Sequence, residues 1–175
     1  MKALYLHGLN TVSSGKAALL ESRGHAVVCP ALDHARPLAV REVLRATLAA
    51  HPDLDVAIGS SLGGFWGFYA AQRLGAPRTA LINPCLDPDD AMRRIENPPP
   101  EEVAAAYAEL RREAEAAPLD AARYRVYVAL DDDVVPPALA MKRFAAPSLR
   151  ALATGGHRLA QFAGLVPEIA AFAAG

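Results

Sequence analysis

Along the chain, short apolar runs typical of buried strands alternate with segments whose apolar residues recur at helical spacing. Short, nearly continuous apolar runs recur, at residues 3–6, 26–30, 56–59, 79–83, 125–130 and 148–154. Runs of this length, bounded by Gly, Pro or Asn, predict buried strands. Between them apolar residues recur at helical spacing, over roughly 14–23, 37–50 and 62–74, and again in a terminal helix interrupted near Gly164 and Pro167. The alternation indicates an α/β protein whose parallel sheet is covered on both faces.

One segment, between the fourth and fifth strands, interrupts this alternation. It contains a predicted helix with prolines before its start, Glu101 and Glu102 in its first turn and Pro118 beyond its end. The apolar residues form one stripe, made of Val103, Ala106, Tyr107, Leu110 and Ala114. Ligands bind at the carboxyl ends of parallel strands, and the insertion begins at that edge. We therefore expect residues 86–119 to cap a site; a helix that only packs is the alternative.

A Gly-x-Ser-x-Gly sequence lies where the third strand gives way to a helix. Residues 59–63 are GSSLG. Glycines two positions before and after Ser61 leave space where strand and helix crowd together, and the sharp turn exposes the hydroxyl. The pattern predicts that Ser61 is a nucleophile and that the Leu62 amide, at a helix N-terminus, binds an oxyanion. A Gly-Ser loop without chemistry is the alternative.

A nucleophilic serine needs a base and an acid, and in a nucleophile elbow these follow it in the order Ser, acid, His. Of the five histidines, only His157 follows the last strand and leaves a strand end before it for the acid. That strand end carries Asp131, Asp132 and Asp133, and their position along the chain does not choose among them.

The loop after the first strand is expected to complete the oxyanion hole. It has the sequence HGLN, and we expect the Leu9 amide to be the second donor, with Asn10 as the alternative. His7 is expected to shape this loop rather than to act as a second base. For substrate contacts the candidates are Phe65, after the elbow, and Tyr107 and Leu110, on the insertion helix.

The segments YLHGLN, GSSLGG, INP, DDDVVPP and GGHR together resemble the α/β-hydrolase superfamily, and specifically its small YqiA-like bacterial esterases. The resemblance spans nearly the whole chain. It implies a carboxylesterase for short acyl esters with Ser61, Asp132 and His157 as the catalytic triad. The acid in such enzymes stands two residues before an apolar pair that leads into proline, which selects Asp132. Because Ala129 stands where the superfamily often has glycine, Asp133 remains the alternative.

The resemblance also implies a topology. A reduced, three-layer α/β-hydrolase fold would have six parallel strands in the order 2-1-3-4-5-6, with a short helical cap. Cys29 and Cys85 would then lie at the ends of two strands that are three strand spacings apart. The two cysteines would be separated by about 14 Å, which is too far for a disulfide.

Composition excludes several classes of function. The 175 residues fit one domain, and 18 basic against 19 acidic residues give a net charge of −1 without a basic stripe for nucleic acid. No apolar run approaches the length of a membrane span, and the N-terminal residues MKALYLHGLN predict a strand rather than a signal peptide. We expect a cytoplasmic protein without metal or cofactor, whose partner is a small-molecule ester. The sequence leaves the oligomeric state open.

Two other functions share this pattern. A thioesterase or acyltransferase would use the same triad and oxyanion donors. A binding protein of the same fold would do no chemistry, but such proteins usually lack a member of the triad, whereas serine, acid and histidine are all present here.

Overall fold

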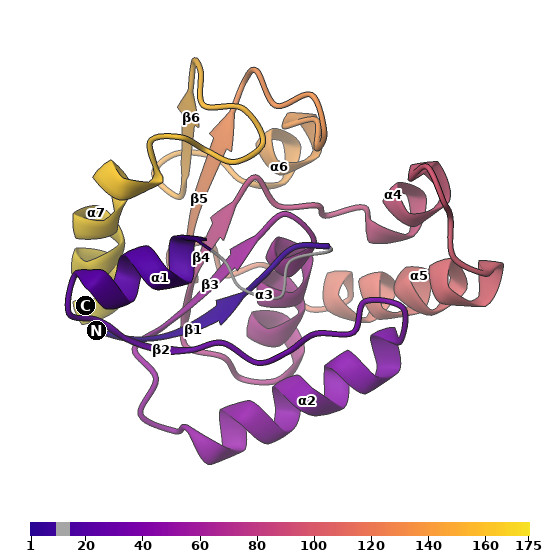
Figure 1. The fold of residues 1–175 in the computed structure, drawn as a ribbon, viewed down its shortest axis with the longest axis horizontal. Coiled ribbons are helices and arrows are strands. Elements are labelled where there is room, and N and C mark those ends of the chain that lie inside the picture. The colour runs from indigo at the N-terminus through magenta and orange to yellow at the C-terminus, as the bar shows by residue number, and fades with distance from the viewer. Residues whose placement is uncertain (10–14) are drawn as a thin grey trace.

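The computed structural model describes residues 1–9 and 15–175, in which strands and helices alternate (Figure 1). The strands are β1 (Lys2–Leu6), β2 (Ala26–Val28), β3 (Val56–Ser60), β4 (Arg78–Ile82), β5 (Tyr124–Ala129) and β6 (Leu149–Leu152). The helices are α1 (Gly15–Ser22), α2 (Pro37–Ala50), α3 (Leu62–Arg73), α4 (Pro88–Arg94), α5 (Glu101–Glu115), α6 (Ala138–Arg143) and α7 (Phe162–Ala174), with one 3₁₀ turn, Ala121–Arg123.

All six strands of the sheet are parallel, and their order is β2-β1-β3-β4-β5-β6. This confirms the predicted topology. The parallel arrangement brings the carboxyl ends of β3, β4 and β5 to one edge, where the chain continues into Ser61, Asn83 and the three aspartates. Residues far apart in sequence therefore meet at that edge.

Helices cover both faces of the sheet and make three layers (Figure 1). Successive side chains of a strand point to opposite faces. In β1, Leu4 and Leu6 join the core shared with α2, α3 and α5, whereas Ala3 and Tyr5 join the core shared with α1 and α7. Because both faces of the central strands β1, β3, β4 and β5 are buried, these strands are mostly apolar, as the sequence pattern indicated. The edge strands β2 and β6 are partly exposed, although the sequence pattern predicted buried strands there.

The insertion differs from the expected single helix, because α4 precedes α5. Boundary signals for α4 are present in the sequence: Pro88 at its start, Asp89 and Asp90 in the first turn, and Arg93 and Arg94 in the last. These place proline and acidic residues at the N-terminus and basic residues at the C-terminus, which favours a helix. Its short length hides the apolar periodicity on which the prediction depended.

Helix α5 packs into the core, which corrects the expectation that its apolar stripe contacts substrate. Tyr107 and Leu110 have no exposed surface, and neither does Phe65 on α3. The Tyr107 ring lies 5.8 Å from that of Phe65, and its hydroxyl donates a hydrogen bond to the His34 carbonyl. The stripe is apolar because it is buried against α3, so these three residues belong to the core.

Truncating the α5 stripe is therefore expected to lower stability rather than to change selectivity. Leu110→Ala should reduce the free energy of unfolding by about 2–5 kcal/mol, because it leaves a cavity in a packed core. Urea unfolding measures the change. The matched control is Leu38→Ala, because Leu38 lies on α2 with 49 % of its surface exposed, and a change within about 0.5 kcal/mol is expected there. An unaltered stability together with a shifted acyl-length preference would contradict this placement.

Candidate active site

Ser61 occupies a strained turn between β3 and α3. Its φ and ψ are 57° and −124°, which side-chain-bearing residues rarely adopt. The turn is held by backbone hydrogen bonds: the Ser61 amide donates to the Ile82 carbonyl at 3.0 Å, and the Ser61 carbonyl accepts from the amides of Gly64 and Cys85. The neighbouring segments thus fix an unfavourable conformation that presents the side chain at the edge of the sheet.

The two glycines of the motif are required by close backbone approach. A Cβ atom on Gly59 would overlap the Gly63 carbonyl, and a Cβ atom on Gly63 would overlap the Leu6 carbonyl. No side chain fits at either position without moving backbone atoms. This confirms the steric reason inferred from the sequence for the Gly-x-Ser-x-Gly spacing.

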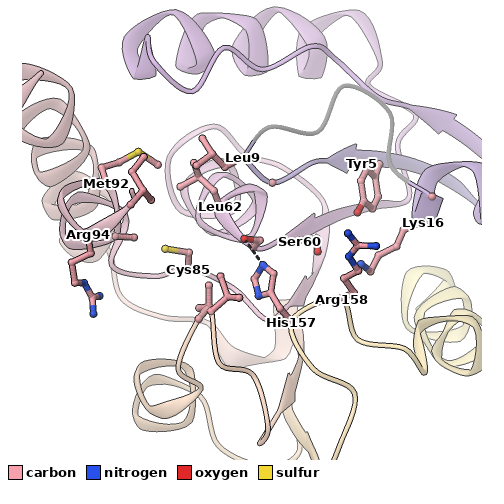
Figure 2. A pocket seen from close by; sticks show the side chains of 17 residues that line it. Tyr5, Leu9, Lys16, Ser60, Leu62, Cys85, Met92, Arg94, His157 and Arg158 are labelled. Carbon is pink, nitrogen blue, oxygen red and sulfur yellow. Dashed lines mark hydrogen bonds between the residues drawn. The ribbon is translucent and has the colours of Figure 1, made fainter. Parts of the chain in front are cut away.

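Three side chains from separate strand ends form a chain of hydrogen bonds. His157 Nε2 lies 3.1 Å from Ser61 Oγ, drawn as the dashed line in Figure 2. His157 Nδ1 lies 3.0 Å from Oδ2 of Asp132 and 3.1 Å from its Oδ1. With the Nδ1 proton donated to the carboxylate, Nε2 is free to accept the proton of the serine hydroxyl.

The structure distinguishes among the three consecutive aspartates. Asp132 has a fully buried side chain, and its Oδ1 accepts hydrogen bonds from the amides of Val134 and Val135, both at 2.9 Å. Asp133 is exposed and has no hydrogen-bond partner among the described residues. Asp131 accepts from the amides of Gly155 and Gly156. Only Asp132 therefore contacts the histidine.

The loop that carries His157 is anchored on two sides. Besides the contact from Asp131, the buried Asn83 donates its side-chain amide to the carbonyls of Gly156 and His157, at 2.9 and 3.0 Å. Its side-chain oxygen accepts from the Ala129 amide at 2.8 Å, so one residue ties the end of β5 to this loop. The sequence showed Asn83 only as part of the INP segment. A polar residue directly after a buried strand was the available signal.

His7 joins two loops through its ring nitrogens. Its Nε2 accepts a hydrogen bond from the Leu32 amide, and its Nδ1 lies 2.9 Å from the Gly8 carbonyl. Both ring nitrogens are thus engaged with backbone. This placement agrees with the predicted loop-shaping role.

The two residues proposed as oxyanion donors, Leu9 and Leu62, lie beside the Ser61 turn (Figure 2). Leu62 begins α3, so its amide has no acceptor within the helix. No other acceptor for it occurs among the described residues. Asn10, the alternative second donor, lies outside the residues that the structure describes.

A pocket of about 890 Å³ opens over Ser61 and His157. The described residues that line it include an apolar group on and after α4 and in the loop after β5, namely Ala91, Met92, Ile95, Val134 and Val135. Tyr107, Leu110 and Phe65 are not among them. Sequence reasoning missed this group because α4 was not recognised and because the two valines served only to place the acid.

Cys85 also lines the pocket but is unsuited to act as a nucleophile. It is buried, and burial raises the pKa of its thiol to about 12, so the thiolate is scarce at neutral pH. Cys29 is exposed, and both cysteines are free thiols, as the predicted strand order required.

The described part of the chain contains neither a candidate metal site nor a helix that could span a membrane. No cluster of three or more His, Cys, Asp or Glu residues there could hold a metal ion. None of the helices described is long and apolar enough to cross a membrane.

The profile of the uncharacterised protein family UPF0227 matches residues 2–174 of the sequence. The chain therefore belongs to this family. No curated protein matches this UPF0227 member.

Solved structures similar to this UPF0227 protein share its fold. One is the esterase domain of a Rhodothermus marinus protein, 21% identical, with a TM-score of 0.62 over 97% of this chain and 83% of that one. Another is a putative hydrolase of the α/β superfamily from Xanthomonas campestris, 21% identical, with a TM-score of 0.58 over 95% and 98%. A third is the fluorophosphonate-binding serine hydrolase F of Staphylococcus aureus, 15% identical, with a TM-score of 0.67 over 99% and 83%. The chain thus has the α/β-hydrolase fold.

Proposed function

We propose that this protein is a serine hydrolase that cleaves carboxylic esters of short acyl chains through an acyl-enzyme. The observation that carries the proposal is the hydrogen-bonded series from Asp132 through His157 to Ser61, which ends at a strained strand-to-helix turn. A serine in this geometry has a base within reach, and the base has an acid that orients it.

In the first half of the reaction, His157 Nε2 takes the proton of Ser61 Oγ as the oxygen attacks the ester carbonyl. The amides of Leu62 and Leu9 bind the negative charge that develops on the carbonyl oxygen. Asp132 accepts from Nδ1, which keeps the correct tautomer and stabilises the imidazolium. His157 then gives the proton to the departing alcohol, and the acyl group stays on Ser61.

In the second half, His157 removes a proton from water, which attacks the acyl carbonyl. His157 then returns this proton to Ser61 Oγ as the bond between the serine oxygen and the acyl carbon breaks and the carboxylic acid leaves. The apolar group formed by Met92, Ile95 and the two valines supports a short acyl chain as the group bound beside Ser61. In this proposal the chain is one catalytic domain, and residues 86–119 are an insertion that contributes α4 to the pocket.

Labelling with a fluorophosphonate tests the proposal. Ser61 Oγ should displace fluoride from phosphorus and give a stoichiometric adduct, located by peptide mass spectrometry, that is absent in Ser61→Ala. The S. aureus structural relative is named as a fluorophosphonate-binding serine hydrolase, which makes this probe a suitable choice. In parallel, p-nitrophenyl butyrate and the matching thioester separate an esterase from a thioesterase. An intact protein without adduct at Ser61 would indicate a binding protein that does no chemistry.

A further inference from the structure

Basic side chains line the pocket without acidic ones. Among the described residues that line it are Lys16, Arg94 and Arg158, whereas no aspartate or glutamate contributes. Residues 10–14, between Leu9 and Gly15, have the sequence NTVSS and so add no charged side chain. The charged side chains of the described residues that line this pocket are therefore all basic, although the net charge of the chain is −1.

Two of these cations lie together. Figure 2 shows Lys16 and Arg158 side by side near Tyr5, and Met92 and Arg94 on the opposite side of His157. Arg94 is already neutralised by Asp90, at 2.5 Å. Arg158 is exposed and forms no ion pair with any described residue. We call Lys16 and Arg158 the basic wall.

The surroundings of Lys16 add positive potential to the basic wall. Lys16 lies in the first turn of α1, which contains no acidic residue, and the exposed amides of a helix N-terminus favour an anion rather than a cation. Burial lowers the pKa of Lys16, and the charge of Arg158 lowers it further. An anion placed here would relieve the repulsion and raise the pKa of the lysine back toward its ordinary value.

We propose that the basic wall binds an anionic group, a carboxylate or a phosphate, on the alcohol portion of the ester. This inference rests on the proposed function, since it assigns the leaving group of that reaction. The substrate class is then an ester of a short acyl chain with an acidic alcohol.

The two sides of the pocket determine which half of the ester lies where. The side formed by α4 and the valines is apolar except for Arg94, whose charge is paired with Asp90, and it suits the acyl chain. The remaining half is the alcohol, and its oxygen must lie at His157 Nε2 to receive the proton. Arg158 directly follows His157, so the basic wall begins beside the leaving group.

Esters that differ in the position of the charge test the assignment. The butyryl ester of methyl 4-hydroxybenzoate is neutral, that of 4-hydroxybenzoate carries a carboxylate on the alcohol, and that of 4-hydroxyphenyl phosphate carries a phosphate there. Monophenyl succinate carries its carboxylate on the acyl side instead. The measured quantity is the ratio of kcat/KM for each charged ester to that for the neutral one, which cancels general changes in activity when variants are compared.

The variants remove one positive charge at a time. We expect the ratio of kcat/KM for both alcohol-side anions to fall in Lys16→Gln and in Arg158→Gln, because each variant loses one charged contact. In the double variant, which loses both contacts, the ratio should fall by about tenfold. The matched control is Arg94→Gln, which removes the same charge from the opposite side and should leave these ratios near those of the unmodified protein. Added salt should lower the ratios of the unmodified protein. The larger of its two alcohol-side ratios, carboxylate or phosphate, identifies the natural group.

Ratios that the double variant leaves unchanged would overturn the proposal, and so would an equal loss in Arg94→Gln. A loss confined to monophenyl succinate would place the anion on the acyl half and overturn the assignment to the alcohol. Binding of benzoate and phenyl phosphate to Ser61→Ala, measured by calorimetry, needs no turnover. The comparison is with a triple variant that combines Ser61→Ala, Lys16→Gln and Arg158→Gln. Weaker binding to the triple variant supports the anion site even if no ester is cleaved, and undiminished binding refutes it.

Discussion

Ser61→Ala is expected to lower kcat for p-nitrophenyl butyrate on the order of a thousandfold or more, leaving only the rate due to binding and the oxyanion donors. The alanine variant loses the oxygen that His157 Nε2 contacts at 3.1 Å. Its fold should persist, because the hydrogen bonds of the turn are made by backbone atoms. Steady-state kinetics on a variant whose circular dichroism is unchanged measures the loss.

Ser60→Ala is the matched control for this substitution. Ser60 is the last residue of β3, also lines the pocket and also loses one hydroxyl, but it is not hydrogen-bonded to the histidine. We expect it to retain most of the activity and all of the fluorophosphonate labelling. If Ser60→Ala were inactive and Ser61→Ala active, the nucleophile would be misassigned.

The second large effect is expected for Asp132→Asn, which should reduce kcat by up to ~10⁴. The asparagine keeps the size of the side chain but removes the charge that stabilises the imidazolium. Its amide can also turn toward Nδ1 and favour the wrong tautomer of His157. Rates for Asp131→Asn, Asp132→Asn and Asp133→Asn on one ester, each checked for folding, measure the difference among the three aspartates.

The other two aspartates serve as controls of different kinds. Asp133→Asn should be close to normal, because this carboxylate is exposed and has no partner among the described residues. Asp131 differs from Asp133, because it accepts hydrogen bonds from the amides of Gly155 and Gly156. Asp131→Asn should therefore show an intermediate loss through a looser His157 loop. A large loss in Asp133→Asn with Asp132→Asn near normal would refute the assignment of the acid.

The sequence by itself determined the sheet and the turn that carries Ser61. Local periodicity predicts strand β3 and helix α3. The Gly59 position reports the close approach of strand and helix, since a Cβ atom there would overlap the nearby Gly63 carbonyl, whereas Gly63 is crowded by the Leu6 carbonyl of a distant strand. The strand order came from the family resemblance, and the parallel sheet then brings the ends of β3 and β5 to one edge. These features were predictable because the residues that determine them are neighbours in the chain or obey a general rule of topology.

Only the tertiary structure decided which side chains face the pocket. Tyr107 and Met92 are both buried residues on the insertion, yet only Met92, on α4, lines the pocket, whereas Tyr107, on α5, packs against α3. Asp132 is distinguished from its two neighbours by its contact with His157. Asn83 is recognised as a site residue by its hydrogen bonds to two carbonyls more than seventy residues away. Lys16 and Arg158 belong to opposite ends of the sequence, and packing makes them neighbours. Apolar patterns record that a side chain is buried, but the partner that buries or binds it is set by contacts between distant segments, which local spacing does not encode.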